Sequence, residues 1–247
     1  MIELIQIFLL YIIFSVTLFV PINVFGHSLK KYKVVPLQIS TINLIINLNL
    51  LLFISLLNYS IDIYQGYLIA FYLIIFLIIY HKGLSNFYKN YFQYRYVFIT
   101  FFILAINVAS ELKLGWDAQF FYYIKSLYFF ENKTILNLND FASNKYHPHF
   151  GSYLWGFFRN LSMNGIEYTG RLFYVYIFCI SIFYLTSKEK NNYLNILIYL
   201  IIITATYQYK YFSGLQDILL FSILVIISKY IHNYKISKEK IYLFLIL

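Results

Sequence analysis

Charged residues, cysteine, proline and glycine are all scarce in this chain. Only 12% of its 247 residues are charged, whereas 61% are hydrophobic. A soluble domain of this length has no need of so much apolar surface, so the composition indicates that lipid is the solvent. One cysteine, Cys179, excludes an intrachain disulfide. With nine glycines and three prolines, the chain has no Gly/Ser linker and no low-complexity tail.

Several common enzyme signatures are also missing. The sequence contains no P-loop, no dinucleotide fingerprint, no HExxH, no GxSxG and no DXD motif. The formal charge of +9 is carried by lysines in short clusters between apolar segments, a pattern typical of membrane topology. No nucleic-acid partner is therefore expected.

What the chain does have is long apolar runs, with a mean hydropathy of +0.68. They predict an all-α polytopic transmembrane bundle that forms one domain over residues 1–247, with about seven spans and the start of an eighth at Ile241. The first run has no basic start and no cleavage site, so it is expected to be retained. The predicted spans are Ile2–Phe25, Leu37–Leu57, Ile63–Tyr80, Tyr96–Ala109, Arg171–Leu185, Tyr193–Tyr207 and Leu215–Ile231. Because the last run stops partway, the chain is expected to be a fragment.

The lysine clusters orient these spans. If the spans alternate, all the basic clusters fall on one side, which the positive-inside rule makes cytoplasmic. The clusters are Lys30–Lys33, Lys82–Arg95, Lys188–Lys190 and Lys229–Lys240. The expected location is thus the cytoplasmic (inner) membrane, with an extracytoplasmic loop over about residues 110–170. This orientation requires Phe150–Leu161 to be an interfacial or re-entrant helix. If that segment crossed the membrane, the orientation of every later span and loop would be reversed.

The outer loop carries an acid among aromatics, in the run Leu114-Gly-Trp-Asp-Ala-Gln-Phe-Phe-Tyr-Tyr123. Asp117 precedes a predicted interfacial helix, so one interpretation is a helix N-cap. The other is a general base that removes the acceptor proton during glycosyl transfer. The two interpretations are compatible with each other. The aromatics are membrane-belt residues by default, with Tyr122 or Tyr123 expected to face a site.

The segment Gly115–Tyr122 resembles the first-loop motif of the GT-C superfamily, membrane glycosyltransferases that take sugars from polyprenyl-phosphate carriers. The resemblance covers about Gly115 to Asp217. It implies that Asp117 is catalytic and that Trp116, Gln119 and Tyr122 contact substrate. Three helices precede the one before this loop, where the simplest members have none, and most later helices and the C-terminal domain are missing. If that reflects truncation, the chain alone is expected to be inactive.

Three further groups fit the resemblance. The end of the family's loop corresponds to Tyr146-His147-Pro148-His149, although a second His replaces the usual Pro or Leu. The two histidines would contact the donor phosphate or a divalent metal. The alternative is that they lie at the polar start of a helix that begins with the proline. Arg171 opens the next span and would bind phosphate, or extend toward lipid phosphate. Asp217, after Gly214, would complete the site or cap a helix, with Lys210 as a phosphate contact.

The sequence therefore predicts a membrane glycosyltransferase that moves sugar from a polyprenyl-phosphate donor to a lipid, glycan or protein acceptor. No cofactor is assigned. A divalent metal would draw on Asp117, His147, His149 and Asp217. Two alternatives are a polysaccharide polymerase or flippase, which needs no Asp117 motif, and a transporter, which would place its ionisable residues inside the spans.

Overall fold

The computed structural model describes residues 2–14, 95–132, 150–162, 165–186 and 192–238, together with the single positions Asn49, Phe53, Leu57, Asp62, Gln65 and Gly66. Within these residues every regular element is a helix, so the all-α prediction is confirmed for this part of the chain.

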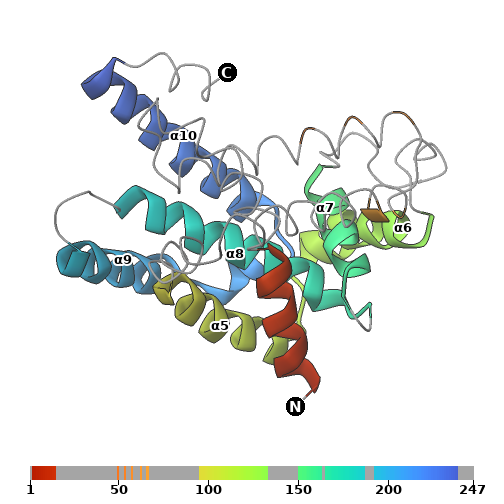
Figure 1. The fold of residues 1–247 in the computed structure, drawn as a ribbon. Helices are drawn as coiled ribbons and strands as arrows, with labels where there is room; N and C mark the ends of the chain where they lie inside the picture. Colours follow the sequence, from red (N-terminus) through yellow and green to blue (C-terminus); the bar gives the residue numbers. More distant parts are fainter. Residues whose placement is uncertain are drawn as a thin grey trace, which may run out of the picture.

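Helix α8 (Glu167–Thr186) forms the centre of the fold. Helices α5 (Arg95–Ser110), α7 (Phe150–Asn160), α9 (Asn192–Thr206) and α10 (Asp217–Ser237) all pack on it, and Figure 1 shows it lying among them. Its sequence is apolar around most of its circumference, as expected of a helix surrounded by neighbours. The N-terminal helix (Ile2–Phe14) lies against the bundle through Phe14, whose ring centroid is 5.1 Å from that of Phe158 and 5.6 Å from that of Phe173.

Helix α7 is packed between α6 (Ile124–Asn132) and α8. Two glycines make these contacts close: a Cβ on Gly156 would lie 2.8 Å from the Ser126 carbonyl oxygen, and one on Gly170 would lie 2.2 Å from the Trp155 carbonyl oxygen. With 11 residues, α7 is about 16 Å long, too short to cross a hydrocarbon core of about 30 Å. A helix is therefore present within the predicted segment Phe150–Leu161, and residues 151–158 are buried; that it does not cross the membrane stays a prediction.

Two of the described helices are long and apolar enough to cross a membrane by length and composition: Glu167–Thr186 and Asp217–Ile236. The first has 89% of its apolar window buried within the protein and the second 28%, so the second has far more apolar surface that the described residues leave uncovered. The other apolar helices, Ile2–Phe14, Arg95–Ser110 and Tyr193–Thr206, are shorter. They overlap three more predicted spans.

The remaining predicted spans cannot be compared in the same way. Almost all of Leu37–Leu57 and Ile63–Tyr80 lies outside the described residues, as does the run that begins at Ile241. The number of spans and the side of the membrane on which each loop lies therefore stay predictions.

Candidate functional site

The Asp117 motif lies on an unusual turn of helix. After α5 ends, residues 111–115 form an irregular strap, and helical backbone resumes at Trp116. Residues Ala118–Tyr123 then form a π-helix, η2, which continues into α6. Single π-turns inside α-helical segments are rare and are found frequently at functional sites. The sequence predicted a helix here but gave no indication of the π-turn.

The strap is held against the segment that precedes Asp217. The Gly115 N–H donates to the Ser213 carbonyl at 2.9 Å. The Tyr209 hydroxyl, from the 3₁₀ turn η4 (Tyr209–Phe212), donates to the Lys113 carbonyl at 2.6 Å and also contacts the Glu111 carbonyl. These bonds join two loops that are far apart in the sequence, one leading to Asp117 and the other to Asp217.

Close packing around one indole reinforces this junction. Gly214 has a positive φ of 98°, a conformation that costs a glycine little. A Cβ there would lie 2.6 Å from Trp155 Cη2 and 2.8 Å from Ala118 Cβ. Gly214 thus fits between Trp155 and the residue that follows Asp117. Trp155 is fully buried and donates its indole N–H to the Glu167 carbonyl at 3.1 Å.

The carboxylates of Asp117 and Asp217 act on the same phenol. Both acids are exposed. Burial first, and then the charges of Asp217 and Asp117, raise the pKa of Tyr122 above its ordinary value of 10.0. The structure therefore places these three predicted residues within electrostatic reach of one another, and Tyr122 stays protonated at physiological pH.

Helix capping does not account for either acid. Asp117 has helical φ and ψ angles of −61° and −35°, and its side chain makes no capping hydrogen bond. Asp217 is the first residue of α10, after the cap residue Gln216. Its position in the first turn still complements the helix dipole. The capping interpretation is thus not borne out by hydrogen bonding at Asp117, whose exposed carboxylate is open to solvent or a ligand.

Aromatic side chains form one side of the Asp117 turn. Trp116 is 67% exposed, and its ring centroid lies 5.0 Å from that of Phe120 and 5.9 Å from that of Phe121. Gln119 lies beside them and closes the turn, because its side-chain amide donates to the Leu114 carbonyl at 2.9 Å. The amide nitrogen of Gln119 is thus occupied by the Leu114 carbonyl, whereas the Trp116 ring is largely exposed.

Arg171 has a different setting from the one predicted. It is fully buried and donates from Nε and Nη2 to the two carboxylate oxygens of Glu167, at 2.7 and 2.9 Å. Its Nη1 donates to the Phe212 carbonyl at 2.9 Å. Phe212 directly precedes Ser213, which accepts from Gly115. These contacts make Arg171 a positioning residue for the loop junction, and its predicted phosphate contact stays a prediction.

Of the remaining predicted site residues, Lys210 is described by the structure and the two histidines are not. Lys210 is exposed at the junction, with its ammonium 5.2 Å from the centroid of the Tyr211 ring. His147 and His149 lie outside the described residues. Among the described residues no three His, Cys, Asp or Glu side chains are grouped as a metal site would require, so the divalent metal stays a prediction.

The sequence interpretation missed the polar contacts that hold α7. The Tyr174 hydroxyl donates to the Gly151 carbonyl at 2.7 Å, and the Gln216 side chain donates to Ser152 Oγ at 2.8 Å. A Cβ on Gly151 would lie 2.5 Å from Gln216 Cδ. These contacts place the start of α7 against the start of α10. The sequence does show the glycine that permits this close packing, but it does not show which residue packs against that glycine.

No known protein family, curated protein or solved structure matches the chain. The chemistry of the site therefore has to be argued from the residues themselves.

Proposed function

We propose that this chain is a membrane glycosyltransferase that moves a sugar from a polyprenyl-phosphate carrier to an acceptor, with Asp117 as general base. The observation that carries the proposal is the pair of exposed carboxylates, Asp117 and Asp217, whose charges both act on Tyr122. The similarity of Gly115–Tyr122 to the GT-C loop motif supports the same assignment. The two lines of support are independent. The motif was identified from the sequence around Asp117, whereas Asp217 belongs to a different segment of the chain.

The proposed step is a displacement at the anomeric carbon. The acceptor oxygen or nitrogen attacks this carbon while Asp117 takes the acceptor proton, and the bond to the carrier phosphate breaks. The phosphate leaves with the bonding electron pair as the polyprenyl phosphate. A positioned carboxylate contributes about 10²–10⁴-fold to such a step. Tyr122, which stays neutral, can donate a hydrogen bond within the same site, and the open Trp116 ring suits the apolar face of a sugar.

A membrane location is part of the proposal. Helix α10 has the length and hydropathy of a span and leaves apolar side chains uncovered, among them Leu220 at 59% and Leu224 at 54% exposed. Helix α9 does the same with Leu197 at 55% and Ile201 at 56%. Lipid is the solvent that makes such surfaces favourable. A multi-pass arrangement in the cytoplasmic membrane, with the Asp117 loop outside, follows from the lysine clusters.

A transporter is the principal alternative. It would be expected to hold ionisable groups deep in its spans. The buried ion pair Glu167–Arg171 lies instead in the first turns of α8 and bonds to the loop junction. Asp117 and Asp217 likewise stand before or at the start of a helix. This distribution favours chemistry at a membrane face over passage through the bundle.

The direct test is Asp117→Asn in membranes that contain the full-length protein. Labelled undecaprenyl-phosphate hexoses and pentoses are supplied with a membrane acceptor fraction, and transferred label is measured. Asn keeps the size of Asp but cannot accept the proton, so the rate should fall by about two to four orders of magnitude. Glu111→Gln is the matched control, since Glu111 is an exposed acid on the same strap whose backbone carbonyl makes the contact to Tyr209. Near wild-type transfer by Asp117→Asn would remove the general-base role and favour transport.

A further inference from the structure

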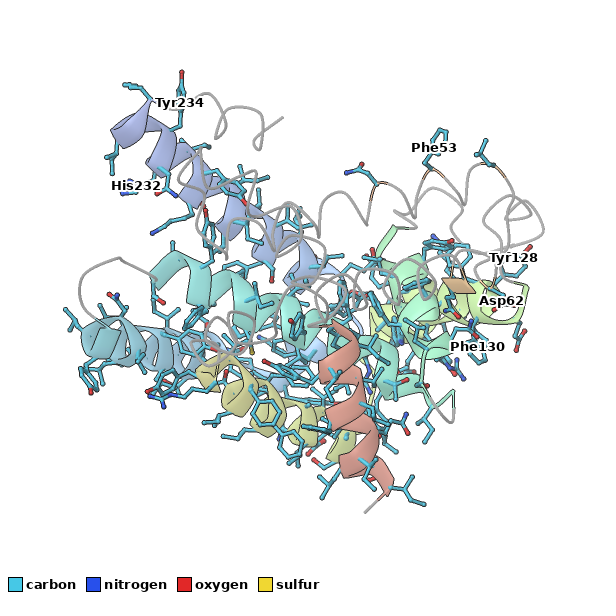
Figure 2. The ribbon with its side chains drawn as sticks, in the orientation of Figure 1. Phe53, Asp62, Tyr128, Phe130, His232 and Tyr234 are labelled. Atoms are coloured by element: carbon cyan, nitrogen blue, oxygen red, sulfur yellow. The ribbon has the colours of Figure 1, made fainter. Side chains whose placement is uncertain are left out.

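The last turn of α10 carries a basic surface that the site around Asp117 does not use. Figure 1 shows this end of α10 diverging from α8, and Figure 2 labels His232 and Tyr234 on different sides of it. Lys235 lies in the last turn, and Lys238 follows as the C-cap residue. Both side chains are exposed. These two lysines, three residues apart on neighbouring positions of the helix surface, are called the basic end of α10 below.

The ammonium groups of the basic end are open to a partner. Lys235 forms no hydrogen bond or ion pair within the described part of the chain. Lys238 places its ammonium 5.8 Å from the centroid of the Tyr234 ring. Lys229, earlier in α10, differs because its Nζ donates to the Leu185 carbonyl at 3.1 Å. Lys229 thus holds the end of α8, whereas the basic end leaves its charges at the surface.

The formal charge of this region is positive. Residues 229–240 contain four lysines and one acid, Glu239, which gives four minus one, or +3. Residues 187–191, which follow α8, add two lysines against one acid. Within α10 the acid is Asp217, in the first turn. The carbonyl end of a helix carries a partial negative charge of about half an elementary charge, so an excess of positive charge remains.

An uncovered apolar line joins the basic end to Asp217. Positions three or four apart share one face of a helix, and the exposed residues at this spacing are Phe221, Leu224, Ser228 and Ile231. From Asp217 to Lys235 this line is about 27 Å long, close to the hydrocarbon core of about 30 Å. An apolar line of this length with a charge at each end fits a bilayer, and it places the basic end at the level of the lipid headgroups.

Apolar side chains lie among the charges of the basic end. Ile231 is 39% exposed and Ile236 72% exposed, on either side of Lys235 in the sequence. Exposed isoleucines give a nucleic acid or an acidic protein segment little to bind. They suit the boundary between headgroups and hydrocarbon, where lysine stems cover apolar surface and the ammonium groups extend toward lipid phosphate. The mixture therefore favours a lipid surface over a soluble polyanion.

We propose that the basic end of α10 binds the headgroups of anionic phospholipids, on the membrane face opposite to Asp217. This inference rests on the membrane location that is part of the proposed function, and it uses none of the sugar chemistry. A lysine close to an anionic bilayer surface raises the local preference for anionic lipid by about fivefold. Two adjacent lysines should therefore enrich such lipids beside the end of α10.

A fluorophore beside the basic end gives a local readout. It is attached at Ile236→Cys in a Cys179→Ala background, because Ile236 is exposed and the native cysteine is buried. The protein is placed in phosphatidylcholine nanodiscs that contain phosphatidylglycerol or phosphatidylcholine with a nitroxide quencher near the start of one acyl chain. The two quenchers are used at the same mole fraction. Leu220→Cys, which is 59% exposed near Asp217, carries the same fluorophore as the control at the other end of α10.

At Ile236→Cys, phosphatidylglycerol should quench several-fold more strongly than phosphatidylcholine, and high salt should reduce this excess. At Leu220→Cys the two lipids should quench equally. Lys235→Gln combined with Lys238→Gln should remove most of the excess. Lys113→Gln combined with Lys210→Gln removes the same charge from two exposed lysines at the other end of α10, and should keep the excess.

Lys235→Arg combined with Lys238→Arg protects the test against local unfolding, since the charge is kept and the excess should be kept with it. Equal quenching by the two lipids at Ile236→Cys overturns the proposal, as does an excess that survives the paired glutamine variant. Lysine-dependent retention of a labelled RNA without any lipid excess would assign the surface to nucleic acid. Absence of quenching by either lipid at both positions would remove the membrane location, and this inference with it. Loss of sugar transfer alone would leave the basic end unaffected.

Discussion

The Gly115 N–H and the Ser213 carbonyl are joined by a hydrogen bond of 2.9 Å. This bond fixes the loop of Asp117 against the loop of Asp217, and both ends of it belong to the main chain. Arg171 supports it, because its guanidinium holds the carbonyl of Phe212, the residue before Ser213. The apposition of the two acids therefore depends on a junction built from backbone and one buried arginine.

Gly115 and Ser213 should be energetically coupled. A Cβ on Gly115 would lie 2.9 Å from Ser213 Oγ, so Gly115→Ala forces that hydroxyl to move. A double-mutant cycle with Ser213→Ala should show an interaction energy of about 1 kcal/mol, because the second substitution removes the hydroxyl that obstructs the first. Denaturant titration of the four proteins in detergent measures it. Additive effects would contradict the contact.

The Arg171–Glu167 pair should behave as a buried ion pair. Arg171→Met leaves the Glu167 carboxylate, which is 17% exposed, without this partner and should destabilise the fold by about 3–5 kcal/mol. Replacing Glu167 as well, by Leu, should restore part of the loss. Unfolding of both variants in detergent gives these values. If Arg171→Met kept its stability and raised only the KM for the donor, Arg171 would be a substrate contact instead.

Lys125 should make stability depend on pH. Burial lowers the pKa of its ammonium below the ordinary value of 10.5. The unfolded chain therefore binds more protons than the folded one between the folded pKa and 10.5, and stability should rise with pH across that window. Lys125→Met should lose this rise. Melting temperatures of both proteins from neutral pH up to the ordinary lysine pKa provide the comparison, since the contribution of the tyrosines is common to the two.

The proposed membrane topology predicts which positions are labelled from outside. In a Cys179→Ala background, a cysteine at Asn137 should react with an impermeant maleimide, whereas cysteines at Lys188 or Lys235 should not. The native Cys179 is buried, so its removal simplifies the background. Labelling at Lys188 from outside would show that residues 150–161 cross the membrane and that the downstream orientation is inverted.

Hydrophobic runs predicted where several of the described helices lie, because an apolar run of helical length is kept away from water whether it lies in lipid or among other helices. Runs starting at Tyr96, Arg171, Tyr193 and Leu215 correspond to α5, α8, α9 and α10. The sequence also allowed Asp117 to be grouped with Asp217, because the predicted topology places both acids on the same side of the membrane. The partner of Arg171 was visible as well, because Glu167 precedes it by four residues, the spacing of a helical ion pair.

Other features depend on tertiary contacts that no local pattern encodes. The π-turn at Ala118–Tyr123 lies beside the close packing of Ala118 against Gly214 and Trp155. The bond from Arg171 Nη1 to the Phe212 carbonyl joins α8 to the loop before α10. Such properties emerge only when segments distant in sequence are placed together.

The junction between Gly115 and Ser213 also forms late during synthesis of the chain. About a hundred residues separate the two loops, and synthesis proceeds at about 5–20 residues per second. The Asp117 loop therefore waits on the order of 5–20 seconds before the chain that carries its partner has been made. During that interval Asp117 has no Asp217 beside it, and a nascent chain released before Ser213 would contain the motif but no assembled site.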